Sequence, residues 1–286
     1  MKRLLFALLA CPALACASSS GSGGPSLKDK PRPQSYFVGE AGRNWYMKGK
    51  GALGIVELAT EVAGQVDIGG KVVTIVTQKV QFKNPQARIE QFSTMYLVED
   101  GDTVKLYRQD SSAEGEIPSE KDLALSQTQL MVPAAPYAKK DYKPGEKWEV
   151  ASNTLTIEKL ADPAFFSPDR VAAIAADPSK APPNAKKQSG TGKAEVVGAG
   201  KIKTPAGEFD TIKIRETMPS GPPGMQVFNY YAKGFGVVRT EMMMGAKPFM
   251  MIDLVEVDSD RATKFLGEWS GKQRLDRIKA AVGPSQ

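Results

Sequence analysis

The sequence has no histidine and only two cysteines among its 286 residues. Without histidine, the chain has no Ser-His-Asp triad, no Cys-His dyad and no imidazole metal ligand. Both cysteines, Cys11 and Cys16, lie near the N-terminus, so the rest of the chain has neither a disulfide nor a thiolate site. These absences exclude much hydrolytic, redox and metal-binding chemistry. The remaining composition, 41% hydrophobic and 24% charged, is typical of a globular protein.

Sequence motifs for other common activities are also missing. The chain contains no S-x-x-K, G-x-S-x-G or Walker A pattern. A pair of carboxylates remains the one catalytic device that the composition permits, but no pair stands out. The net charge is only +6, and no basic cluster is interleaved with aromatic residues. We therefore expect no enzyme, no cofactor, no metal and no nucleic-acid partner.

The N-terminus has the pattern of an export signal. Lys2 and Arg3 precede a short apolar stretch, which small residues connect to Cys16. The stretch is shorter than the roughly 20 residues that span a bilayer. Ala13-Leu14-Ala15 fits ordinary cleavage, but with Cys16 it also resembles a bacterial lipobox, and Cys11 ends a second one. We expect a lipoprotein-type signal peptide over residues 1–16, with Cys16 acylated; plain secretion and Cys11 are the alternatives.

The segment after Cys16 supports a membrane anchor. Residues 17–35 are mostly Ser, Gly and Pro, a composition that cannot bury enough apolar surface to fold. We interpret them as a flexible tether between the membrane and a folded domain. Ala17, in place of Asp, is compatible with sorting to the outer membrane. The expected location is the cell envelope, lipid-anchored, facing either the periplasm or the surface.

Residues 36–258 show the pattern of a β-domain, in which short β-branched runs alternate with turn signals. The clearest turn is Thr204-Pro205-Ala206-Gly207, where Pro205 fixes φ and Gly207 can adopt positive φ to close a three-residue hairpin loop. We therefore interpret Pro205 and Gly207 as structural residues. Residues 55–66 fit either a helix or a strand, and the hairpin signal that follows favours a strand.

Helices are expected in two places. Ser167 can cap a helix over Pro168–Ala176, within an insertion spanning residues 161–190. The tail, residues 259–286, has helical periodicity with a break near Gly271. An aromatic, Gly and Trp pattern near Trp45 recurs near Trp148, which suggests two half-domains, 36–141 and 142–258.

Three motifs resemble a known family. They are Lys143-Pro144-Gly145-Glu146-Lys147-Trp148, Thr204-Pro205-Ala206-Gly207-Glu208-Phe209-Asp210, and Tyr230-Tyr231-Ala232-Lys233-Gly234-Phe235-Gly236-Val237-Val238. In this order they resemble the TapB-like family of bacterial exported β-domains of unknown function, over about residues 142–258 and more loosely over 36–141. The resemblance implies an all-β fold outside the cytoplasm, a strongly curved antiparallel sheet or barrel, and no catalytic residues. The insertion and a methionine-rich hairpin depart from the family pattern.

The methionine-rich hairpin is unusual. Its five methionines flank one short turn: Met242, Met243, Met244, Met250 and Met251. Thioethers make a soft, adaptable apolar surface, so we interpret the group as a candidate apolar contact. Core packing and a Cu(I) site are the alternatives, although alternate strand residues point to opposite faces.

The predicted function follows from the predicted cellular location and the fold class. We expect a non-catalytic envelope lipoprotein that acts as a binding or scaffolding module. An apolar ligand or lipid carrier in a barrel cavity is one alternative, and a carboxylate-based hydrolase is another. The expected partners are the membrane, reached through Cys16, and an unidentified envelope protein or apolar ligand.

Overall fold

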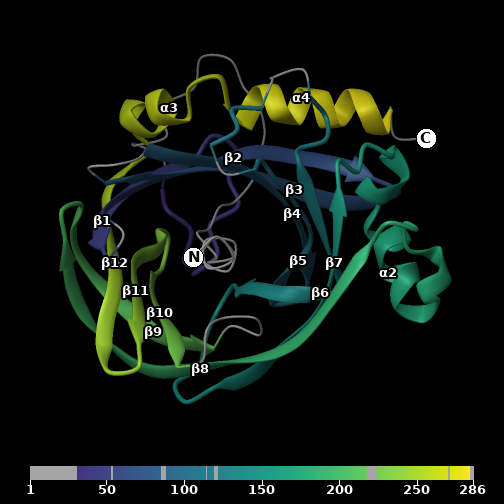
Figure 1. Ribbon diagram of the computed structural model, residues 1–286. Coiled ribbons are helices and arrows are strands. Elements are labelled where there is room, and N and C mark those ends of the chain that lie inside the picture. Colours follow the sequence, from purple (N-terminus) through teal and green to yellow (C-terminus); the bar gives the residue numbers. More distant parts are fainter. Residues whose placement is uncertain are drawn as a thin grey trace.

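The described part of the chain forms one closed antiparallel β-barrel (Figure 1). The computed structural model describes residues 31–52, 54–84, 88–113, 115–118, 122–217, 224–269 and 271–283. The predicted signal peptide, Cys11 and Cys16 lie outside these residues. Within them, twelve strands follow one another around the barrel in chain order. The prediction of an all-β curved sheet or barrel is therefore confirmed.

The first six strands end at the connection where we expected the boundary between the two halves. They are β1 (Asn44–Gly51), β2 (Gly54–Ile68), β3 (Lys71–Lys83), β4 (Arg88–Asp100), β5 (Thr103–Ser111) and β6 (Gln127–Lys139). The other six are β7 (Lys147–Glu158), β8 (Lys186–Thr204), β9 (Gly207–Thr217), β10 (Met225–Ala232), β11 (Gly236–Met244) and β12 (Lys247–Val257). β1 pairs with β12, so both halves close a single barrel, and both contribute residues to the hydrophobic cluster inside it.

The segment with ambiguous periodicity is a strand. Val56, Leu58 and Val62 on β2 all belong to the cluster inside the barrel. The alternate residues of β2 face outward, and Ala59 packs in a separate cluster beneath α3. The outer face of β2 therefore also carries apolar residues, because helices cover it, and this made the period of two hard to separate from a helical pattern.

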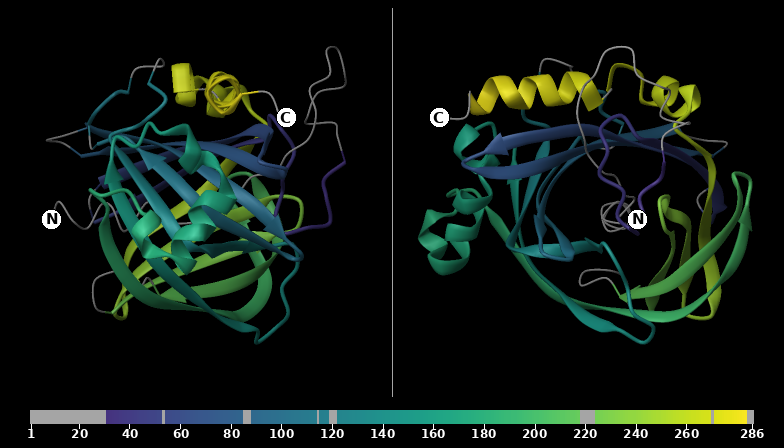
Figure 2. Two further views of the ribbon diagram at one scale, coloured as in Figure 1. Left: turned by 90° about the vertical axis from the view of Figure 1, so that its right-hand side faces the viewer. Right: turned by 180° about the vertical axis from the view of Figure 1, so that it is seen from behind.

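Helices cover part of the outer wall. α3 (Asp260–Leu266) and α4 (Gly271–Val282) lie across β2 and β3, and η4 (Gly267–Trp269) connects them (Figures 1 and 2). Gly267 has φ of +61°, so the tail breaks as expected, a few residues before Gly271. None of the described helices is long and apolar enough to cross a membrane.

The insertion carries α2 (Pro168–Ala176) between the short helices η2 (Pro163–Phe166) and η3 (Pro178–Lys180). Ser167 caps α2 by accepting a hydrogen bond from the backbone N–H of Arg170, as expected. Figure 2 shows α2 on the outside of the barrel. The insertion is shorter than residues 161–190, because β8 begins at Lys186 and pairs with β7.

The turn at Pro205 and Ala206 connects β8 to β9. Thr204 pairs with Gly207, so the loop has two residues and is shorter than the three-residue loop that the pattern indicates. Gly207 has φ of +139°, in the region that glycine adopts at least cost. The Thr204 hydroxyl accepts a hydrogen bond from the backbone N–H of Ala206 at 3.2 Å, which holds the turn.

The last residues of the predicted tether are part of the folded body. The Arg32 guanidinium lies 2.8 Å from Asp258 and 4.3 Å from the centre of the Phe235 ring. The Ser35 carbonyl accepts a hydrogen bond from the N–H of Gly234 at 2.8 Å. The N-terminal segment therefore crosses one end of the barrel before β1 begins, and any free tether ends before Arg32.

Candidate ligand-binding site

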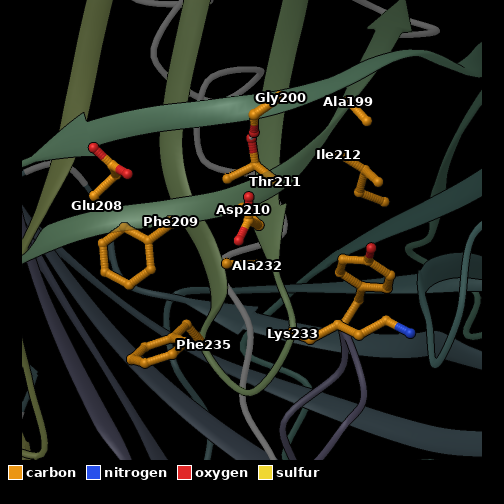
Figure 3. A pocket seen from close by; sticks show the side chains of 11 residues that line it. Ala199, Gly200, Glu208, Phe209, Asp210, Thr211, Ile212, Ala232, Lys233 and Phe235 are labelled. Carbon is orange, nitrogen blue, oxygen red and sulfur yellow. The ribbon is translucent and has the colours of Figure 1, made fainter.

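A pocket of about 460 Å³ opens at the end of the barrel that the N-terminal segment crosses (Figure 3). We call it the end pocket. Its walls come from β8, β9, the turn between β10 and β11, and the segment before β1. The lining residues are Tyr36, Ala199, Gly200, Glu208, Phe209, Asp210, Thr211, Ile212, Ala232, Lys233 and Phe235. Its volume lies within the range of small-molecule sites.

The end pocket exists because two hairpins separate. β9 pairs with β10 only from Ile212 to Glu216. The first residues of β9, Gly207 to Thr211, pair with β8 alone. The β10–β11 turn takes a different path, since the indole N–H of Trp45 donates a 2.7 Å hydrogen bond to the carbonyl of Phe235. The space between the β8–β9 hairpin and this turn is the pocket.

The wall of the end pocket is aromatic on one side. Phe209 and Phe235 meet edge to face with their ring centres 4.9 Å apart, and both lie together in Figure 3. Ile212 lies across from them, and Tyr36 packs on Tyr142 at 5.5 Å. Apolar rings and aliphatic side chains therefore offer burial to an apolar ligand.

The charged groups of the pocket are already paired. Lys201, beside the pocket, lies 3.0 Å from Asp210 and 3.8 Å from Glu208. The hydrogen bond to Asp210 raises the pKa of Lys201. Lys233 pairs with Asp141 at 3.3 Å. These exposed pairs form a polar rim that can orient a ligand, and they contribute little to stability.

The pocket offers little for catalysis. The pKa of Tyr36 is raised, mainly because the phenol is partly buried, and the positive charge of Lys233 opposes this shift. Glu208 and Asp210 keep most of their side-chain surface exposed beside Lys201, so neither is held in the dry environment of a general acid. Among the described residues, no group of three or more acidic, cysteine or histidine side chains can hold a metal ion.

The structure divides the five methionines between the two faces of the wall. Met242 and Met250 are paired across β11 and β12, are buried, and belong to the cluster inside the barrel. Met244 packs at the edge of that cluster. Met251 is 43% exposed, and Met243 lies on the same strand as Met242 with the opposite parity. The five therefore do not form one continuous contact surface.

Two of the family-like motifs supply most of the end-pocket walls, although neither motif by itself indicates a pocket. Glu208, Phe209 and Asp210 belong to one of the family-like motifs, and Ala232, Lys233 and Phe235 belong to another. The two motifs face each other across the pocket (Figure 3). Residues that we interpreted as turn and packing elements thus form the walls of the end pocket.

A family model described as DUF3108-like matches residues 170–247. The match lies within the half of the chain that carries the family resemblance, and it includes most of the end-pocket residues. Its description is not the TapB-like name that the motifs suggested. No curated protein matches the chain.

Solved structures similar to this chain include three bacterial proteins. One, from Bacteroides fragilis NCTC 9343, is described as inferred to be exported with a YmcC-like fold; it has 12% identity and a TM-score of 0.42 over 76% of this chain and 96% of its own. Another, inferred to be a lipoprotein of Parabacteroides distasonis ATCC 8503, has 15% identity and a TM-score of 0.37. The match covers 80% of this chain and 100% of that protein. The third is a β-barrel-like protein of the DUF1849 domain of unknown function, from Brucella abortus, with 10% identity and a TM-score of 0.38. The match covers 76% of this chain and 98% of that protein.

Proposed function

We propose that the protein is a non-catalytic binding module that holds an acyl chain, or a ligand of similar apolar character, in the end pocket. The observation that carries this proposal is the pocket itself, with Phe209 and Phe235 on one wall and Ile212 on the other. Burying apolar ligand surface against these residues would contribute about 25 cal/mol per Å². The paired charges at the rim suit the polar end of an amphipathic ligand.

The position of the end pocket fits a membrane-derived ligand. We propose that Cys16 carries the lipid anchor and that the protein is exported to the outer membrane, as a member of the TapB-like group. Fourteen residues lie between Cys16 and Pro31, and as the proposed flexible tether they would reach about 5–6 Å × √14, or about 21 Å. Arg32 contacts Phe235 of the pocket wall, so the pocket would lie close to the bilayer surface.

A fluorescent fatty acid tests the binding function on the purified full-length protein. Gly200 lines the pocket, and a Cβ placed there has no neighbour within 4 Å, so Gly200→Leu adds a bulky side chain at the pocket wall without a clash. We expect this variant to bind cis-parinaric acid at least tenfold more weakly than the wild type. Absence of saturable binding by the wild type would contradict the proposal.

Gly198→Leu is the matched control. Gly198 lies on the same strand, also has open space around its Cβ position, and does not line the pocket. We expect this variant to bind the probe as the wild type does. Equal affinities of the Gly198 and Gly200 variants would mean that the probe binds elsewhere.

A further inference from the structure

The segment before β1 forms part of the wall of the end pocket. We call residues 31–36 the strap. Tyr36, at the end of the strap, lines the pocket. The guanidinium of Arg32 lies 4.3 Å from the centre of the Phe235 ring, which also lines the pocket. A movement of the strap would therefore change the wall against which a ligand packs.

Backbone hydrogen bonds attach the strap to two connections at this end of the barrel. The N–H of Tyr36 donates a 3.0 Å hydrogen bond to the carbonyl of Lys140, between β6 and β7. The N–H of Gly234, between β10 and β11, donates a 2.8 Å hydrogen bond to the carbonyl of Ser35. These two bonds would break if the strap lifted, so they report on its position.

The strap and the residues after it differ in burial. None of residues 31–36 is buried, whereas the next two, Phe37 and Val38, are 4% and 0% exposed and belong to the inner cluster. Segments with few buried apolar contacts open at lower free energy than the core to which they are joined. A movement of the strap would therefore stop at Phe37 and leave the barrel intact.

Arg32, which attaches the strap through its side chain, shares a carboxylate with a second arginine. The Asp258 carboxylate lies 2.8 Å from Arg32 and 2.6 Å from Arg43. The Arg43 side chain is fully buried, whereas that of Arg32 is 20% exposed. Burial lowers the pKa of Arg32, Asp258 opposes this shift, and the charge of Arg43 adds to it. If Arg32 leaves, Asp258 keeps Arg43 as its counter-ion, so no buried charge is left unpaired.

The sequence around Arg32 is basic and adjoins the proposed anchor. Lys28, Lys30 and Arg32 alternate with Asp29 and Pro31, so three cations stand against one acid. A guanidinium binds phosphate through two parallel hydrogen bonds, and basic segments beside a membrane anchor are attracted to anionic lipids. An anionic lipid surface would therefore compete with Asp258 for Arg32.

We propose that the strap is a detachable wall of the end pocket, and that an anionic lipid surface releases the ligand by taking Arg32 from Asp258. Detachment removes Tyr36 from the wall and leaves Phe209 and Ile212. The ligand then buries less apolar surface and dissociates faster. The release of a ligand rests on the proposed function, whereas the movement of the strap is measurable without a ligand.

Transfer of bound cis-parinaric acid to vesicles tests the release. The donor is the full-length chain with Cys16→Ser, so that no lipid anchor brings it to the vesicles. We expect release at least tenfold faster to vesicles of equal parts phosphatidylcholine and phosphatidylglycerol than to pure phosphatidylcholine. Adding Arg32→Gln should make release fast to both kinds of vesicle, since the strap is then already detached.

Arg88→Gln is the matched control. Arg88 pairs with Glu90 where β4 begins, at the opposite end of the barrel. This variant should keep the preference for anionic vesicles. Equal release to both kinds of vesicle by the donor without further changes would overturn the proposal. Slow release to both by Arg32→Gln would also overturn it, because Arg32 would then contact the membrane without holding the strap.

Amide hydrogen exchange follows the strap without any ligand. We expect the N–H of Tyr36 to exchange at least tenfold faster in Arg32→Gln than in the wild type. Gly234→Ala is the second variant, because a Cβ there would lie 2.7 Å from the Cβ of Arg32 and should displace the strap from the opposite side. Unchanged exchange in both variants, with probe binding intact, would overturn the strap alone. A wild type that binds no probe would contradict the proposed function, and ligand release with it.

Discussion

Gly207 shows how one residue determines a turn of this barrel. Its φ of +139° is accessible to glycine, and a Cβ at this position would have no neighbour within 4 Å. The cost of Gly207→Val is therefore backbone strain alone, which we expect to lower the free energy of unfolding by about 1–3 kcal/mol. Urea denaturation should show a lower midpoint.

Gly198→Val provides the control for this prediction. Gly198 also has open space around its Cβ position, and its φ lies outside the region that favours glycine. We expect little change in its urea midpoint. Equal midpoints for the Gly207 and Gly198 variants would show that the turn tolerates a β-branched residue.

Glu216 makes the stability of the barrel depend on pH. It faces the interior from β9, because it pairs with Ala194 and Val227 of the inner cluster. Burial, the largest cause, raises the pKa of Glu216 from 4.5 to about 7, against a hydrogen bond from Asn229 that lowers it. The carboxyl retains some accessible surface, so water reduces this effect in part.

The sign of the pH effect follows from proton binding. The folded chain holds the Glu216 proton more tightly than the unfolded chain, so this contribution to stability is complete below about pH 4.5 and is lost as the pH rises to about 7. We expect Glu216→Gln to raise the thermal midpoint at pH 8 and to leave it nearly unchanged at pH 4. A variant that is less stable than the wild type at pH 8 would contradict this assignment.

At the scale of elements, a buried ionic group attaches the C-terminal helix to the barrel. Arg274 of α4 is almost fully buried, lies 3.3 Å from Asp110 of β5, and donates to the carbonyls of Asp122 and Leu123 at 2.9 and 2.8 Å. Arg108 binds the same carboxylate at 3.0 Å and stacks on Phe166 at 3.8 Å. One buried carboxylate therefore serves two guanidinium groups.

This stoichiometry predicts unequal mutational costs. Asp110→Asn leaves two buried cations without a counter-ion and should lower the free energy of unfolding by about 3–5 kcal/mol. Arg274→Met leaves a matched pair of Arg108 and Asp110, so we expect a smaller loss, of about 1–3 kcal/mol. Adding Arg274→Met to Asp110→Asn should cost little further stability, as urea denaturation of the double mutant can show. Additive losses would argue against a shared carboxylate.

The elements that could be predicted from the sequence are those with local signals. Ser167 and Pro168 determine the start of α2, and Gly207 determines a hairpin, because capping and positive φ depend on neighbouring residues. The end pocket has no such signal, since it joins Tyr36, Phe209 and Phe235 only after the barrel closes.

At the scale of the whole molecule, the N-terminal segment connects the proposed anchor to the ligand site. If Cys16 is acylated, Cys16→Ser should move the protein from the membrane fraction to the soluble envelope fraction, since the substitution removes the attachment site of the lipid. Fractionation and immunoblotting measure this shift. The variant Cys11→Ser is the control and should stay membrane-bound. Unchanged membrane association after both cysteines are replaced would exclude a lipid anchor.

Native mass spectrometry of the full-length protein, purified from cell envelopes, tests the central claim most directly. It should reveal a non-covalent acyl-bearing ligand beyond the mass of the chain and its covalent anchor. We expect this ligand to be absent from Gly200→Leu and retained by Gly198→Leu, because Gly200 lines the end pocket and Gly198 does not. A wild-type protein without ligand, or one whose ligand is retained equally by Gly200→Leu, would contradict a binding function for the end pocket.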